Sequence, residues 1–216
     1  LTPVNNTKLL TCQGGSIVDA SPAGHSITNN GATAVYNDIS YFTFDGSSDY
    51  VSSNAVLPAG QQQYTISTWW KTSDAIETQV IWEQNVSGTA VQHKRAAMVI
   101  NNTYCGFSGH SNDALYLVNI TANTWINVVM VVDITRQYAI YMYKNGSLDA
   151  VANPNNGASN LDVGTGGASI GKTVVTNLLS DGYFNGQISN VTIYNRALTS
   201  TEVTKNFNAL RGRYGI

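Results

Sequence analysis

The sequence predicts an all-β protein, a two-sheet antiparallel sandwich with one short C-terminal helix. Short segments with apolar residues at alternate positions recur about every ten residues, as they do in sandwiches. Clusters of Gly, Asn, Asp and Ser separate these segments, and one segment near the C-terminus has apolar residues at helical spacing instead. A chain of 216 residues is long enough for a single domain with one sizeable core.

The N-terminal part is the least regular. Residues 1–40 predict an irregular arm whose short strands pack on a body formed by residues 41–216, so that the whole is a single domain. A hairpin opens this body: Phe42 and Phe44 share one face, and Asp45 begins the turn.

The middle of the chain contains the most regular strands. Segments 64–71 and 79–84 alternate in the β pattern, and segment 125–133 is apolar at both sets of alternate positions. We therefore expect the last of these to be covered on both faces. Asn145-Gly146, which follows a strand at 138–144, is the preferred dipeptide of a type I′ hairpin turn.

The last strand runs through Gly182–Leu198 and is expected to contain a bulge. Ile188 is out of phase with Val191 and Ile193, which a strict two-residue alternation does not allow. We place the extra residue near Ser189-Asn190.

A short helix follows this strand. Thr199 and Glu202 have the spacing of a capping box, in which a hydroxyl and a carboxylate satisfy free amides at a helix start. Val203, Phe207 and Leu210 then fall on one helical face. The sequence therefore predicts a terminal helix that packs on the sandwich.

Composition excludes several classes of partner. Charged residues are 11% of the chain and the net charge is −2, so the protein has no basic field for nucleic acid. The apolar runs, such as Val128–Val132, are too short to insert in a membrane. His93-Lys94-Arg95, a lone basic triplet, is expected in a solvated loop.

The chain starts with Leu rather than Met, and we expect a processed product or part of a longer protein.

The two cysteines of the chain leave two alternatives open. Cys12 and Cys105 either pair across the domain, which would suit an oxidising environment, or act as small buried hydrophobic residues. They do not predict a zinc site, because no His lies at ligand spacing.

Six segments carry a resemblance to a known family, and in chain order they are residues 44–51, 64–71, 125–133, 143–146, 170–172 and 184–198. Their sequences and order are similar to laminin-G-like domains of the concanavalin A-like lectin/glucanase superfamily. The last segment is the most specific, because Phe-Asn-Gly-Gln-Ile, Tyr-Asn-Arg-Ala-Leu and a following helix occur together. The resemblance covers about residues 40–210 and implies a jelly-roll sandwich of two curved antiparallel sheets.

The two ends of the chain resemble a narrower group. The N-terminal pattern of Leu9–Gln13 followed by Asp19–Ser21, and the ending Asn208–Ile216, are similar to laminin-G-like structural proteins of tailed phages of marine bacteria. This resemblance implies a structural protein of a virion.

The superfamily includes glycoside hydrolases, but the chain lacks their carboxylates. A retaining glycosidase needs two carboxylates about 5 Å apart, which on a strand means positions i and i+2 or i+4 facing one groove. The predicted strands carry Glu83 alone, and no Glu-x-Asp-x-x-Glu pattern occurs. The sequence therefore predicts no catalytic residue and no enzymatic activity.

The resemblance also implies a calcium site. Laminin-G-like and related lectin domains often bind one ion at a sandwich rim, through Asp side chains and backbone carbonyls. Asp45, Asp49 and Asn185 are the residues that match in this chain, since hard cations take oxygen ligands from turns. The alternative is that they make Asx-turn hydrogen bonds and that the protein has no cofactor.

Carbohydrate binding would need an exposed aromatic side chain with polar neighbours. The four tryptophans all lie on predicted strands and are expected in the core, namely Trp69, Trp70, Trp82 and Trp125. The candidate ligand-binding aromatics are Tyr104, Tyr116 and Tyr183.

Together these features predict a non-enzymatic structural protein at a virion surface, either a capsid decoration or a tail or fibre component. Its expected partners are other virion proteins, copies of itself, and a host or matrix glycan, with neither nucleic acid nor membrane insertion. The alternative is an extracellular, secreted or surface-attached carbohydrate-binding module of lectin type.

Overall fold

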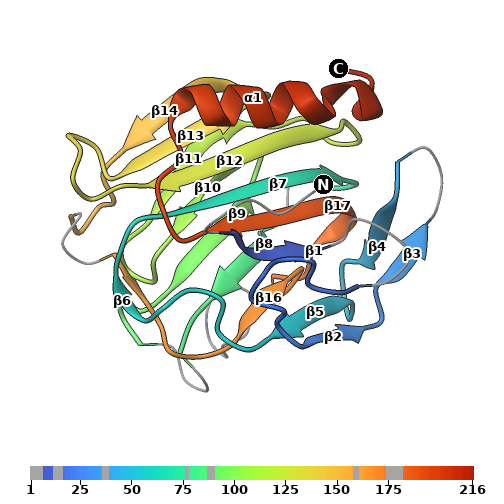
Figure 1. The fold of residues 1–216 in the computed structure, drawn as a ribbon, viewed down its shortest axis with the longest axis horizontal. Helices are drawn as coiled ribbons and strands as arrows, with labels where there is room; N and C mark the ends of the chain where they lie inside the picture. The colour runs from blue at the N-terminus through green and yellow to red at the C-terminus, as the bar shows by residue number, and fades with distance from the viewer. Residues whose placement is uncertain are drawn as a thin grey trace.

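The computed structural model describes residues 7–11, 17–35, 39–75, 78–86, 91–157, 161–173 and 182–216, without the side chains of Leu10 and Tyr116. In this part of the chain, strands form two stacked antiparallel sheets, and one α-helix, α1 (Ser200–Leu210), leads into the 3-10 helix η2 (Arg211–Tyr214) (Figure 1). The predicted all-β sandwich with a short C-terminal helix is confirmed.

Sheet A contains eight strands within the described residues. In spatial order these are β14 (Ser147–Ala152), β13 (Ile140–Lys144), β12 (Ile126–Val132), β7 (Tyr64–Thr72), β17 (Asn185–Tyr194), β4 (Tyr41–Asp45) and β3 (Thr33–Val35), with β1 (Thr7–Thr11) also paired to β17. Every pairing is antiparallel, and neighbours in space are mostly distant in sequence, as in a jelly roll.

Sheet B contains seven strands among the residues described. In spatial order these are β11 (Ala114–Asn119), β10 (Tyr104–Ser108), β9 (Ala96–Asn101), β8 (Gln79–Gln84), β16 (Ala168–Ile170), β5 (Tyr50–Ser53) and β2 (Ile27–Asn30). A small extra pair joins β6 (Gly60–Gln61) to β15 (Asp162–Val163).

The core lies between the two sheets. Phe42, Ile66 and Trp70 of sheet A belong to one buried cluster with Trp82 and Met98 of sheet B. Because side chains alternate between the faces of a strand, neighbours such as Trp69 in sheet A and Ala97 in sheet B point to the outer faces.

The outer face of sheet A is partly covered by the C-terminal helix (Figure 1). Val129 and Val131 of β12 pack there against Val203 of α1 and the nearby Leu198, which confirms that segment 125–133 is covered on both sides. No helix in the described part of the chain is long and apolar enough to span a membrane.

The predicted capping box fixes the start of α1. Glu202 N donates to Thr199 Oγ1 at 3.2 Å, and Thr199 N donates to Glu202 Oε2 at 2.8 Å. The Glu202 carboxylate also accepts two hydrogen bonds from Arg196, which binds the helix start to the end of β17.

The predicted bulge in β17 has a topological role. The register of β17 against β7 shifts between Ile188 and Asn190. On its other side β17 pairs with β4 through residues 185–188 and with β1 through residues 191–194. The bulge therefore marks the point where the strand changes partner.

The hairpin between β13 and β14 has the predicted turn. Asn145 and Gly146 have φ values of 48° and 79°, which is the left-handed pair that a type I′ turn requires. A Cβ on Gly146 would lie 2.6 Å from Cδ1 of Phe207, so α1 rests directly on the turn.

Candidate functional site

The predicted calcium ligands lie at one rim of the sandwich, where β4 meets β17. The antiparallel register places Asn185 opposite Asp45, and Gly46 N donates to the carbonyl of Phe184 at 3.1 Å. A Cβ on Gly46 would lie 2.8 Å from the Cβ of Asn185. The fold thus brings Asp45 and Asn185 side by side, although 140 positions separate them in the numbering.

The Asp45 carboxylate is occupied by its own turn. Its Oδ1 accepts hydrogen bonds from the amides of Ser47, Ser48 and Asp49 at 2.8, 2.7 and 3.0 Å. Its Oδ2 accepts from the hydroxyls of Ser47 and Ser48 at 2.8 and 2.6 Å. These donors, led by the Ser48 hydroxyl, hold the pKa of Asp45 well below its usual range. The arrangement is an Asx turn.

Asp49 closes the same turn. Its Oδ2 accepts a hydrogen bond from Asp45 N at 3.1 Å. Burial of the side chain, together with the negative charge of Asp45, raises the pKa of Asp49. Gly31 approaches closely, because a Cβ there would lie 3.1 Å from Cγ of Asp49.

The donor set around this rim fits the Asx-turn alternative better than an ion. Calcium needs six or more oxygen ligands, whereas among the described residues no three His, Cys, Asp or Glu side chains gather to hold a metal. The backbone of Asn185 is also engaged, since its carbonyl accepts from Thr72 Oγ1 and Ser73 N at 2.9 Å each. The calcium site at Asp45, Asp49 and Asn185 stays a prediction.

The candidate tyrosines are placed in different parts of the fold. The Tyr183 ring lies 5.1 Å from Nζ of Lys172, and the same Nζ lies 4.5 Å from the ring centroid of Tyr50. Tyr104 begins β10, which β9 and β8 separate from β16 in sheet B. The side chain of Tyr116 lies outside the described residues. Tyr183 therefore belongs to a two-tyrosine clamp around Lys172, and Tyr104 does not.

Cys105 lies in β10 and is fully buried in the core. Burial raises the pKa of its thiol. Cys12 lies outside the described residues, so the pairing of the two cysteines stays a prediction.

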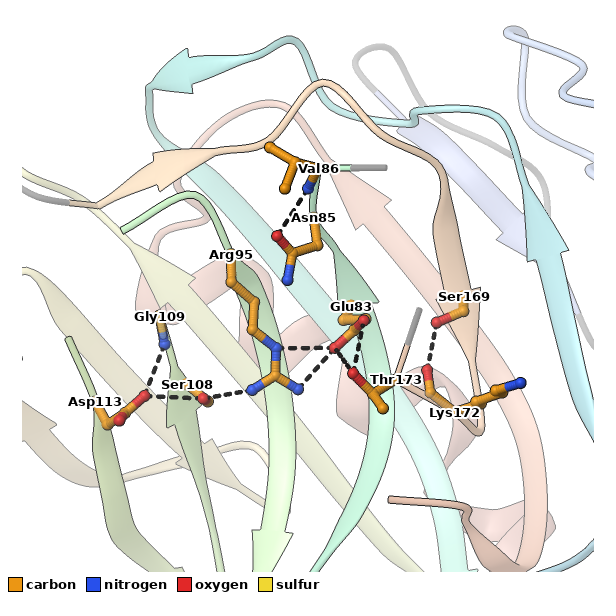
Figure 2. A network of polar contacts seen from close by, with 10 residues as sticks. All are labelled: Glu83, Asn85, Val86, Arg95, Ser108, Gly109, Asp113, Ser169, Lys172 and Thr173. Atoms are coloured by element: carbon orange, nitrogen blue, oxygen red, sulfur yellow. Dashed lines mark hydrogen bonds and ion pairs between the residues drawn. The ribbon is translucent and has the colours of Figure 1, made fainter. Parts of the chain in front are cut away.

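A buried polar network lies on the outer face of sheet B (Figure 2). Glu83 in β8 is paired in register with Ala97 and Ser169. Ala97 belongs to a small cluster with Val80 and Val99, separate from the main core. The Glu83 side chain therefore points away from the space between the sheets.

Arg95 supplies the counter-charge of the Glu83 carboxylate. Its Nε and Nη2 donate to Oε2 of Glu83 at 2.8 and 2.6 Å, and neither side chain has any exposed surface. Thr173 Oγ1 donates to Oε1 of Glu83 at 3.1 Å. Two charge-assisted hydrogen bonds converge on one oxygen, which is the strong kind of pairing that a buried charge requires.

The network continues beyond the ion pair (Figure 2). Arg95 Nη1 donates to Ser108 Oγ at 2.5 Å, and Ser108 Oγ donates to Oδ1 of Asp113 at 2.8 Å. The amide of Gly109 also donates to that oxygen, at 2.9 Å. The chain of contacts links β8, β10 and the loops that flank β9 and β10.

A laminin G family model, described as the concanavalin A-like lectin/glucanases superfamily, matches residues 45–204, well over half of the chain. The chain belongs to this superfamily. The match confirms the resemblance that the sequence segments indicate, at the level of the family.

Solved structures with the same fold include botulinum neurotoxin binding domains. The receptor-binding domain of the C/D mosaic serotype has a TM-score of 0.71 at 13% identity, and the match covers 95% of this chain and 51% of that one. The serotype G binding domain has a TM-score of 0.66 at 16% identity, with 94% and 51% covered. A type C structure, whose cell entry is described as dependent on two ganglioside molecules, has a TM-score of 0.70 at 15% identity, with 95% and 51% covered.

These similarities concern the fold, because the sequence identities are low. This lectin-like sandwich spans about half the length of each toxin domain. No curated protein sequence matches the chain.

Within this superfamily member, Glu83 is not placed to do acid–base chemistry. A catalytic carboxylate must reach a substrate proton, but Glu83 has no exposed surface and both of its oxygens accept hydrogen bonds. The Glu83 carboxylate therefore has a structural role inside the fold.

Two residues of this lectin-like domain differ from the sequence-based expectation. Arg95 was expected in a solvated loop, yet it is 1% exposed, because its guanidinium turns inward to Glu83. Trp125 was expected in the core, yet it is only partly buried, because it precedes β12 and points to the outer face of sheet A. A signal for Arg95 existed: a Glu on an apolar strand needs a counter-charge, and Arg95 directly precedes the next strand.

Proposed function

We propose that this chain is a non-catalytic binding domain at the surface of a virion, as a capsid decoration or as part of a tail or fibre. The observation that carries the non-catalytic part is the buried Glu83–Arg95 pair, which removes the strand carboxylate from any substrate. The setting rests on the resemblance of both chain ends to structural proteins of tailed phages. The domain would act through contacts with other virion proteins, with copies of itself and with host-surface groups.

Protein composition of purified virions tests the setting. The chain is expected as a stoichiometric component that stays with the particles through a density gradient. If the particles lack it and the protein occurs only as a free secreted product, the virion role is wrong.

Polysaccharide hydrolysis tests the non-catalytic part. Incubation with a panel of neutral and acidic polysaccharides should release no new reducing ends. Hydrolysis by the wild-type protein that disappears in a folded Glu83→Gln variant would overturn this part of the proposal, and circular dichroism verifies that the variant is folded.

A second function, glycan binding of lectin type, is favoured by the superfamily and by the toxin structures. One of those structures is described with gangliosides, and another is a complex with SialylT. A glycan array with and without a chelator tests this function. Binding that is lost both with chelator and in Asp45→Ala would support one structural calcium ion at the rim, whereas chelator-insensitive binding would support a site without calcium.

A further inference from the structure

A row of hydrogen-bonding side chains crosses the outer face of sheet A. Thr33 of β3 pairs in register with Thr43 of β4, Thr43 pairs with Gln187 of β17, and Gln187 pairs with Lys71 of β7. Cross-strand partners point to the same side of a sheet. Their strand neighbours, such as Trp70, belong to the core, so this row faces outward.

Two aromatic rings lie beside this row. Ile126 pairs with Trp70, so the preceding Trp125 comes level with Lys71, whose Nζ lies over the Trp125 ring at 5.6 Å from its centroid. The ring centroids of Trp125 and Tyr41 are 5.9 Å apart, and both side chains are partly exposed.

An aromatic stack packs against Trp125. Its ring centroid is 5.1 Å from that of Tyr214, which lies 3.9 Å from Trp69 in a nearly parallel stack. Tyr214 is 7% exposed, and its hydroxyl donates to Ser189 Oγ at 2.8 Å. A ring held in this way loses little conformational entropy when a ligand packs on it.

The helix leaves this part of sheet A open. Figure 1 shows α1 lying along β12–β14, while β4 and β3 extend beyond it. The residues of the open area are partly exposed, and we call them the Trp125 platform: Tyr41, Thr43, Lys71, Trp125 and Gln187.

We propose that the Trp125 platform binds a glycan. The C–H face of a pyranose ring packs on Trp125, and the Lys71 ammonium moves off the Trp125 ring so that the sugar hydroxyls face Lys71 and Thr43. This inference deepens the lectin-type function proposed above and rests on it. A sugar combines one apolar face with a rim of polar groups, which matches two rings bordered by Thr and Lys. A protein partner would favour a wider apolar centre than two rings provide.

Gln187 supplies a second indication of a ligand. Its side-chain carbonyl oxygen is shielded from solvent and has no hydrogen-bond partner within the described residues. Buried acceptors without partners are uncommon and costly. A shift of the neighbouring side chains would open this oxygen to a ligand hydroxyl, because solvent does not reach it in the structure.

An array of neutral and uronic-acid oligosaccharides tests the platform, with the intact protein compared with Trp125→Ala, Trp125→Phe, Lys71→Met and Tyr183→Ala. We expect Trp125→Ala to weaken binding of the retained glycans by roughly tenfold. Trp125→Phe, which keeps a ring, should weaken it less. Tyr183→Ala tests the competing candidate site at Lys172, and if the platform is the site this variant should bind as the wild type does. Weakening by Lys71→Met confined to uronic-acid glycans would identify a carboxylate partner, and equal weakening of all glycans would identify a hydroxyl.

The possible failures are distinguishable. If the wild-type protein retains glycans and Trp125→Ala retains them equally well, the platform is not the site, while the lectin-type function stands. If the wild-type protein retains no glycan of either class, both proposals fail. Thermal unfolding midpoints verify that each variant is folded. If Trp125→Ala does not fold, Trp125→Phe still provides the test.

Discussion

At the scale of single residues, Glu83 shows how a buried charge restricts its surroundings. Its carboxylate lies where no solvent reaches it and is paired with Arg95. Thr173 bonds to Glu83, and Ser108 bonds to Arg95. Removal of either partner would leave the other charge buried without a counter-charge. Loss of the Glu83–Arg95 pair should therefore lower the stability of the fold.

We predict that Glu83→Gln lowers the free energy of unfolding by about 3–5 kcal/mol, because it leaves the Arg95 charge buried and unpaired. Urea denaturation measures the change. Asp162→Asn is the matched control, since the Lys94–Asp162 pair is 41% and 27% exposed, and removing it should cost about 1 kcal/mol or less. Equal effects of the two changes would show that burial of the Glu83 pair has no special cost.

Glu202 predicts a pH dependence of stability. The hydrogen bonds from Arg196, followed by the amide of Thr199, lower the pKa of Glu202 from 4.5 to about 2. A pKa lowered by folding contributes stability that is present above pH 4.5 and is lost as the pH falls toward 2. Urea midpoints between pH 6 and pH 2 should therefore fall less steeply in Glu202→Gln than in the wild type.

The control for this pH dependence is Thr199→Ser, which keeps the capping hydroxyl. It should reproduce the acid slope of the wild type. An unchanged slope in Glu202→Gln would mean that other carboxylates account for the loss of stability in acid.

Residues show most clearly what sequence reasoning can and cannot reach. The capping box at Thr199 and Glu202 was predictable, because both partners lie within one turn of the chain. The register that sets Asn185 beside Asp45 was not predictable, because it depends on which distant strands pair. The exposure of Trp125 was not predictable for a related reason: it depends on where α1 and η2 end over sheet A.

At the scale of elements, β17 organises sheet A. It pairs with β7 along its length and with β4 and β1 on its other side. Its alternation and bulge were visible in the sequence, since they are local patterns of apolar residues. Its three partners were not visible, because pairing over long sequence distances leaves no short pattern.

We predict that Gly186→Ala disrupts this strand. A Cβ at Gly186 would lie 2.8 Å from the Cα of Thr72 in β7, and the φ of +149° is unfavourable for other residues. Since the obstacle is backbone, the free energy of unfolding should fall by about 1–3 kcal/mol or more.

Gly212→Ala is the control for this clash, because a Cβ there meets nothing within 4 Å. It should change the free energy of unfolding little. If thermal unfolding midpoints of the two variants agree, the close approach of β17 and β7 is not tight enough to exclude a side chain.

At the scale of the whole molecule, the N-terminal residues contribute to both sheets. β1 pairs with β17 and β3 with β4 in sheet A, whereas β2 pairs with β5 in sheet B. Leu9 is 2% exposed within the main core. The segment 1–40 thus supplies edges and core that the segment 41–216 would otherwise leave open.

We predict that a shortened chain that begins at Tyr41 does not unfold cooperatively. It would lose the buried Leu9 and Ala32 and would expose strand edges of β17, β4 and β5, which invite aggregation. Near-ultraviolet circular dichroism during heating measures cooperativity, with Leu9→Ala in the full chain as the milder comparison, expected to cost about 2–5 kcal/mol. A shortened chain that melts in one sharp transition near the wild-type midpoint would show instead that residues 41–216 form the sandwich alone. In that case the N-terminal strands would be an attached arm, free to serve contacts between neighbouring copies.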